Sequence, residues 1–231
     1  MPMLSVAQSQ PSERAEFIRK TYIHLAGAIA AFTLIEVILF QTGIAGVLAN
    51  LVFSGGGLGW LAIIGGFTLI GWLSRSLAGQ ADNEGLQYLG LGLYVFIEAL
   101  IFTPLIYIAA VYSDPTVLPT AVILTLCMFG GLTLIAFTTQ KDFSFLGGFL
   151  RIGGFVALGF IICSAIFGFQ LGLLFSLAMV AFASVAILYD PSKVMKHYST
   201  SHHVAASLEL FASVALLFYY ILQILIRMNR R

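Results

Sequence analysis

Hydrophobic residues run along this chain in long unbroken stretches, each close to the roughly 20 residues that an α-helix needs to cross a bilayer. The stretches do not alternate apolar with polar residues, and lipid requires every spanning segment to satisfy its own backbone hydrogen bonds, so helices are predicted and strands are not. The connections are short except at 44–56 and 190–203, which leaves no room for a second domain. The seven predicted segments are residues 21–43, 57–78, 86–112, 116–138, 146–168, 170–189 and 204–226.

Composition supports a membrane protein. Of the 231 residues, 60% are hydrophobic and 9% are charged, whereas an ordinary soluble domain carries about a quarter charged residues. The predicted class is an all-α integral membrane protein, with a polar cytoplasmic segment at 1–20, a transmembrane domain at 21–226 and a basic tail at 227–231. A net charge of +1 gives no reason to expect a nucleic-acid partner.

Lysine and arginine gather on one side of the predicted membrane. Eight of the eleven lie on the side of the N-terminus, and the other three are in the tail. The positive-inside rule therefore predicts a cytoplasmic N-terminus and, with seven spans, an outside C-terminus. A re-entrant last segment would leave both ends in the cytoplasm, and that alternative stays open. The eight residues are Arg14, Arg19, Lys20, Arg75, Lys141, Arg151, Lys193 and Lys196.

Glycines recur on several segments, often in pairs such as Gly90 with Gly92, Gly147 with Gly148 and Gly153 with Gly154. In lipid, helices associate through close approach of their backbones, so these residues predict a compact bundle. Pro104 lies inside the third segment and is expected to bend it.

Four carboxylates lie in or beside the apolar segments: Glu36, Glu98, Asp190 and Glu209. An ionisable side chain near the bilayer centre costs roughly 2.5–3.5 kcal/mol on insertion scales, so such residues are usually functional. Each must be protonated or paired with a base or an aqueous cavity. The alternative for Glu36 and Glu98 is a neutral carboxyl group that joins two helices.

The last segment carries polar residues on one face. Glu209, Ser213, Tyr220, Gln223 and Arg227 are separated by four, seven, three and four residues, which is helical spacing. Such a stripe is expected to face the bundle interior, either as a polar path through the membrane or as a seam between helices. With Glu36 and Glu98, Tyr220 and Gln223 form the predicted intramembrane path.

The sequence gives no sign of an enzyme. No zinc-binding spacing, nucleophile elbow or phosphate-binding loop is present. No cofactor is predicted apart from a bound calcium ion. Arg75 ends the second segment on the same predicted side as Asp190, where it can either extend toward the membrane surface or reach Asp190.

Two motifs carry a resemblance to a known family. Phe129-Gly-Gly-Leu-Thr, followed by Phe137-Thr-Thr-Gln-Lys-Asp-Phe-Ser-Phe-Leu-Gly-Gly-Phe-Leu150, closely resembles the signature between helices four and five of the transmembrane Bax-inhibitor-motif family. Leu188-Tyr-Asp-Pro-Ser-Lys193 is similar to the element that ends helix six in that family. The short N-terminus resembles bacterial members, which implies a multi-pass protein of the bacterial inner membrane.

The resemblance implies six helices around a central seventh and a pH-sensitive calcium leak through the membrane. It implies a gate made of two acidic groups, on helices six and seven, with an arginine of helix two as latch. Asp190 matches the first acid, Ser213 occupies the position of the second, Glu209 lies one turn earlier, and Arg75 matches the latch. Two adjacent carboxylates can share a proton, which couples opening to pH, and their oxygens suit calcium. Asp190 and Glu209 are therefore the predicted calcium ligands.

Two other functions stay open at this point. A proton-coupled transporter of a small solute would use Glu36 and Glu98 as a relay. A non-transporting regulator would bind membrane proteases or proteins of stress and cell death through its helices. The expected partners are the lipid bilayer, calcium ions and other membrane proteins.

Overall fold

The computed structural model describes residues 5–80, 83–139 and 142–229, without the side chains of 57–64 and 67; the predicted basic residues Lys141, Arg230 and Arg231 lie outside the described residues. Within these ranges the chain is helical and contains no strand. The elements are the 3₁₀ turn η1 (Val6–Gln8) and the helices α1 (Pro11–Gln41), α2 (Ile44–Ser54), α3 (Gly56–Ala78), α4 (Glu84–Tyr112), α5 (Val117–Thr138), α6 (Leu146–Phe167), α7 (Leu173–His197) and α8 (His203–Asn229).

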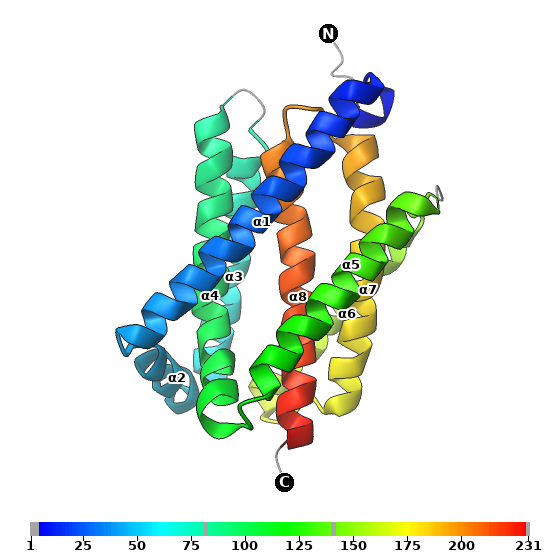
Figure 1. The fold of residues 1–231 in the computed structure, drawn as a ribbon. Coiled ribbons are helices and arrows are strands. Elements are labelled where there is room, and N and C mark those ends of the chain that lie inside the picture. Colours follow the sequence, from blue (N-terminus) through cyan, green and yellow to red (C-terminus); the bar gives the residue numbers. More distant parts are fainter. Residues whose placement is uncertain (1–4, 81–82, 140–141, 230–231) are drawn as a thin grey trace.

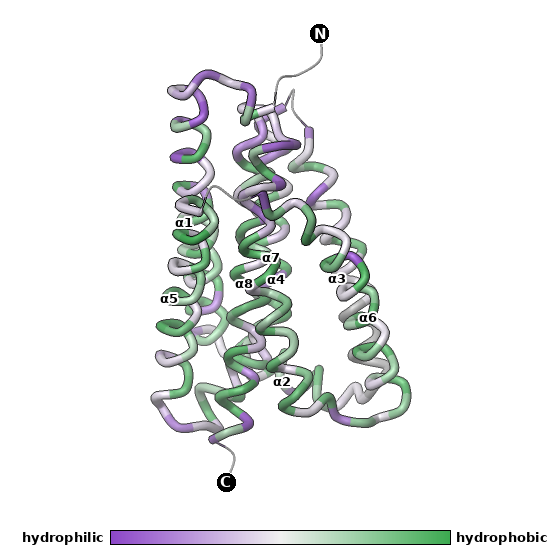
Figure 2. Tube along the Cα trace, turned by 90° about the vertical axis from the view of Figure 1, so that its right-hand side faces the viewer, coloured by the Kyte–Doolittle hydropathy of each residue, from purple (hydrophilic) through white to green (hydrophobic). Residues whose placement is uncertain are grey.

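The helices form three layers (Figures 1 and 2). Helices α1 and α5 lie on one side, α4, α7 and α8 form the middle, and α3 and α6 lie on the other side. Helix α8 is the centre, because it packs against α1, α3, α4, α5 and α7. In the described part of the chain, α6 packs on α3 and α7 and makes no close backbone approach to α8. The central helix that the sequence predicted is thus α8. One of its six predicted neighbours, α6, does not approach it closely within the described residues.

The bundle has the dimensions and the polarity of a multi-pass membrane protein. Six helices among the described residues, α1 and α4 to α8, are long and apolar enough to cross a bilayer. Polar residues gather toward the two ends of the bundle and apolar residues dominate between them (Figure 2). Helix α3 runs beside α4 for 23 residues, a length of about 35 Å.

Helix α8 settles how the last segment runs. It is one helix of 27 residues, and the two chain ends lie at opposite ends of the bundle (Figure 1). The last segment therefore contains no turn between His203 and Asn229. The membrane side on which each end lies stays a prediction.

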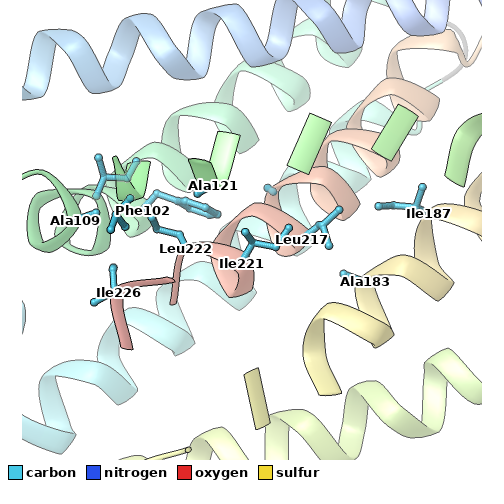
Figure 3. Packing of buried hydrophobic residues seen from close by; sticks show 12 residues of the cluster. Phe102, Ala109, Ala121, Ala183, Ile187, Leu217, Ile221, Leu222 and Ile226 are labelled. Carbon is cyan, nitrogen blue, oxygen red and sulfur yellow. The ribbon is translucent and has the colours of Figure 1, made fainter. Parts of the chain in front are cut away.

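Figure 3 shows the apolar core around α8. Leu217, Ile221 and Leu222 of α8 are almost fully buried, against Ile187 of α7 and Phe102 of α4. A buried side chain of this kind contributes about 1.5–3 kcal/mol in water, but within a bilayer the gain comes from packing rather than from release of water. This core joins the middle layer to α5 and fixes the position of α8.

The predicted connection at 44–56 is wrong, because most of it forms helix α2. Gly43 takes a left-handed conformation with φ of 76° and separates α1 from α2, which glycine allows at no steric cost. Ala45, Ala49 and Val52 are buried at helical spacing, and α2 packs on α4. Eleven residues are too few to cross a bilayer, so α2 covers one end of the bundle.

Helix α7 continues beyond the predicted end at residue 189. Pro191 lies inside it, and the helix ends at His197. Proline removes one backbone hydrogen bond and usually ends or bends a helix. In α7, contacts made by the residues after Pro191 keep the helix continuous. Val194 is buried, and the Ser192 hydroxyl accepts a hydrogen bond from the Phe143 backbone N–H at 3.2 Å.

Some of the predicted glycine contacts are present. A Cβ atom at Gly90 of α4 would lie 2.5 Å from the Ser74 carbonyl oxygen of α3, so only glycine permits this crossing. Gly147 and Gly153 of α6 lie against the rings of Tyr189 and Phe182 of α7. A Cβ atom at Gly92 would meet no side chain or other helix within 4 Å, so a larger residue fits there without a clash.

We expect Gly90→Ala to force α3 away from α4 and to lower the thermal midpoint in detergent, at a cost of about 1–3 kcal/mol for overpacking. Gly92→Ala is the matched control on the same helix and should match or exceed the stability of the wild type, because alanine favours the helix. Equal stability of both variants would mean that α3 does not approach α4 at Gly90.

Candidate functional site

A cavity of about 1220 Å³ runs along the bundle between the middle layer and α3 with α6. Most of its lining comes from five helices, and each contacts the next in the order α3, α4, α8, α7, α6 and back to α3. In Figure 2, α3 and α6 lie on the opposite side of α4, α7 and α8 from α1 and α5. The cavity therefore lies to one side of α8 and explains why α6 does not touch that helix.

The polar stripe of α8 faces this cavity. Glu209, Ser213, Tyr220, Gln223 and Arg227 all line it, as their spacing predicts. Gln223 is also tied to α7, since its side-chain oxygen accepts a hydrogen bond from the Ser176 hydroxyl at 3.2 Å.

One end of the cavity, on the side of the N-terminus, is bounded by two polar contacts between α7 and α8. The Ser213 hydroxyl donates to Asp190 Oδ2 at 2.5 Å, and Asp190 is only 5% exposed. One turn further toward that end, Lys193 Nζ lies 3.0 Å from Glu209 Oε2. The antiparallel helices thus present two contacts in sequence, and the two predicted acids have different partners.

A second, smaller cavity of about 210 Å³ lies beyond these contacts. Arg75 and Glu209 line both cavities, so they lie at the boundary between them. The Tyr198 hydroxyl lies 3.5 Å from Glu209 Oε1. Burial raises the pKa of Tyr198 above its ordinary value, and the charge of Glu209 acts in the same direction, so this phenol stays a neutral donor.

Arg75, the predicted latch, is exposed and takes no part in the ion pairs formed by the described residues. Its guanidinium carbon lies 5.4 Å from the centre of the Tyr94 ring, within the range of a cation–π contact. Tyr94 lies within hydrogen-bonding reach of Glu98, and both line the large cavity. Arg75, Tyr94 and Glu98 therefore continue the polar lining from α3 onto α4.

Glu36 does not line the cavity. It is buried between α1 and α4, where Oε2 lies 3.1 Å from the Thr103 hydroxyl. That hydroxyl is also 2.8 Å from the Ala99 carbonyl oxygen, and a carbonyl only accepts hydrogen bonds. The single hydroxyl proton cannot serve both oxygens. The contacts are complete when Glu36 itself donates to Thr103 as a neutral carboxylic acid.

The other Glu36 oxygen supports this interpretation, because Oε1 is buried without a hydrogen-bond partner among the described residues. A buried ionised carboxylate with an unpaired oxygen would be costly. Glu36 therefore acts as the neutral group joining two helices that the sequence left open, and it is separate from the stripe on α8.

We expect Glu36→Gln to keep the thermal stability of the wild type in detergent, since the amide still donates to Thr103. Thr103→Val should lower the free energy of unfolding by about 1–3 kcal/mol, because it leaves the buried carboxyl group without its partner. Thr33→Val is the control, since Thr33 is exposed and its hydroxyl bonds only to its own helix at Ile29. A destabilised Glu36→Gln would contradict the neutral acid.

The connection between α5 and α6 is fastened to the end of α7. Asp142 pairs with Lys196, and it also accepts a hydrogen bond from the Ser144 backbone N–H. The hydrogen bond to Lys196, with those from Ser144, holds the pKa of Asp142 well below its usual range. This exposed pair lies outside both cavities.

The sequence did not predict that Lys193 would form an ion pair with Glu209. Asp190, Lys193 and His197 are spaced by three and four residues, which would have indicated one helical face. That signal was hidden by Pro191, which favours a helix end. Among the described residues, no three His, Cys, Asp or Glu side chains gather closely enough to hold a metal ion.

These features define a multi-pass α-helical membrane protein with a cavity among its helices that is partly lined by polar side chains. The chain belongs to the Bax inhibitor-1 family: the family described as inhibitor of apoptosis-promoting Bax1 matches it over residues 14–231. An uncharacterized protein of Pseudomonas aeruginosa is 38% identical over 112 residues, covering 47% of this chain and 49% of the relative. An uncharacterized membrane protein of Vibrio cholerae is 31% identical over 130 residues, covering 53% and 55%. The chain thus spans about half the length of these curated relatives.

Proposed function

We propose that this protein is a pH-sensitive leak pathway for cations, calcium among them, in the bacterial inner membrane, with its N-terminus in the cytoplasm. The observation that carries the proposal is the cavity of about 1220 Å³ that three carboxyl groups line: Glu98, Asp190 and Glu209. Five helices that contact one another in sequence contribute residues to the lining of this space. Carboxylate oxygens in a cavity of low dielectric attract a hard cation strongly.

The route would run along the polar face of α8. A cation entering at the level of Arg227 and Gln223 would pass Tyr220 and reach Ser213 with Asp190. From there it would cross the boundary at Glu209 and Arg75 into the smaller cavity. The side chains on this route supply hydroxyl, amide and carboxyl oxygens, which replace part of the hydration shell of the ion.

Protonation would control the route at Asp190. A neutral carboxyl group at this end of the cavity offers no charge to the cation, whereas the carboxylate does. Ser213 donates to the oxygen that a cation would use, so its hydroxyl must turn as the ion arrives. Flux is therefore expected to rise with pH as the carboxyl groups of the cavity ionise.

The test is calcium flux into vesicles that contain a calcium dye and the reconstituted protein. We expect greater flux at pH 8 than at pH 6, and a loss of most of it in Asp190→Asn. Asp142→Asn is the control, because Asp142 is exposed and lies outside both cavities. Flux that is absent at both pH values, or equal in Asp190→Asn and the wild type, would refute the proposal.

A further inference from the structure

The end of the large cavity that Asp190 and Glu209 line also holds an ammonium group of the protein itself. Lys193 lines the cavity one turn beyond Asp190, and its Nζ lies 3.0 Å from Glu209 Oε2. The two side chains are 29% and 20% exposed, so solvent screens the pair less than it screens a surface ion pair. The lysine thus presents a positive charge where a cation on the proposed route would need the Glu209 carboxylate.

The place of this pair in the structure gives it control of the boundary between the cavities. Glu209 lines both cavities, whereas Lys193 lines only the large one. Lys193 therefore approaches Glu209 from the large cavity, on the way from Asp190 to the smaller cavity. A cation that leaves Asp190 toward the smaller cavity meets the lysine first.

Lys193 also differs from the other basic groups around the cavity. Arg75, Arg151 and Arg227 line it as well, but none of them belongs to the ion pairs formed by the described residues. Lys196, on the same helix, pairs with Asp142 outside both cavities. Lys196 is an example of a lysine with a purely structural ion pair, because its partner is exposed and lies outside both cavities. Lys193 instead pairs with an acid that lines the proposed route.

We propose that Lys193 is a tethered counter-ion that occupies the cation position at Glu209 and so holds this end of the cavity closed. The inference rests on the proposed function, because it concerns the same route. A permeating cation must displace the ammonium group from the carboxylate, and no covalent step is involved. The closing element is then an ion pair between α7 and α8, in addition to the carboxyl groups themselves.

The first test compares calcium flux in Lys193→Met and Lys196→Met vesicles at pH 8. Methionine keeps the length of the side chain and removes its charge. We expect flux in Lys193→Met to rise by roughly fivefold, the size of a modest coupling between contacting charges, and flux in Lys196→Met to match the wild type. An unchanged Lys193→Met, or an equal rise in Lys196→Met, would overturn the tethered counter-ion.

A charge exchange tests the pair itself. Lys193→Glu alone should open the route, because it places two acids side by side. Combining it with Glu209→Lys restores an ion pair in the reverse direction, so we expect flux in the double variant to return close to that of the wild type. If the double variant leaks as much as Lys193→Glu, the pair does not close the cavity.

A third measurement separates this inference from the proposed function. Ala212 lines the large cavity, and Ala212→Cys, made with Cys127→Ser and Cys163→Ser, reports on access for a cationic thiol reagent. We expect the reagent, added on the side of the N-terminus, to label this cysteine faster when Lys193→Met is present. Folding of every variant is checked by its thermal midpoint in detergent.

The combined outcomes are distinct. Faster labelling of Ala212→Cys in the presence of Lys193→Met, with no calcium flux in any variant, would support the closing role of Lys193 and refute the leak pathway. Flux in the wild type, with neither flux nor labelling changed by Lys193→Met, would keep the pathway and refute the counter-ion. No flux and no change in labelling would refute both.

Discussion

The arrangement of this bundle depends on one constraint, which is that the polar face of α8 must be kept away from lipid. Polar and charged side chains are expensive in hydrocarbon, and α8 carries five of them along one face. Helix α7 supplies direct partners at Asp190, Lys193 and Ser176. The rest of the face is covered by the cavity, which α3 and α6 close from the other side.

The two sides of α8 are therefore built differently. Toward α1 and α5, apolar and aromatic side chains fill the space, among them Phe32 of α1, Ala121 of α5 and Phe211 of α8 itself. Toward α6, the backbones stay apart and the space remains open. Dense packing on one side holds α8 in place, so that the cavity on the other side can exist without collapse of the bundle.

Much of the fold could be predicted from the sequence because lipid imposes a simple rule on segment length. The seven apolar segments correspond to α1 and α3 to α8, and the spacing on the last one places its polar face correctly. Helix α2 was missed since a run of eleven residues is too short for that rule. Its burial on α4 is a tertiary effect that no local pattern reveals.

The site was predictable only in part, for a different reason. The energetic cost of a carboxyl group in an apolar segment identified Asp190 and Glu209 as unusual. Which side chains they contact depends on how α7 and α8 face each other. The contacts of Asp190 with Ser213 and of Glu209 with Lys193 require α7 to remain helical through Pro191. Proline favours a helix end, so the sequence pattern indicated a loop where the structure has a continuing helix.

The identity of residue 213 then decides what the rest of the site must contain. An acid at this position would lie directly against Asp190, since the Ser213 hydroxyl is 2.5 Å from Asp190 Oδ2. Two carboxylates so close cannot both ionise, and no base would be needed there. With serine at 213, Asp190 receives a neutral donor, and the acid lies one turn away at Glu209, where it is partly buried. A partly buried carboxylate requires a counter-charge, and Lys193 on the opposing helix provides it. The acid at Glu209 and the lysine on α7 are therefore two parts of one arrangement.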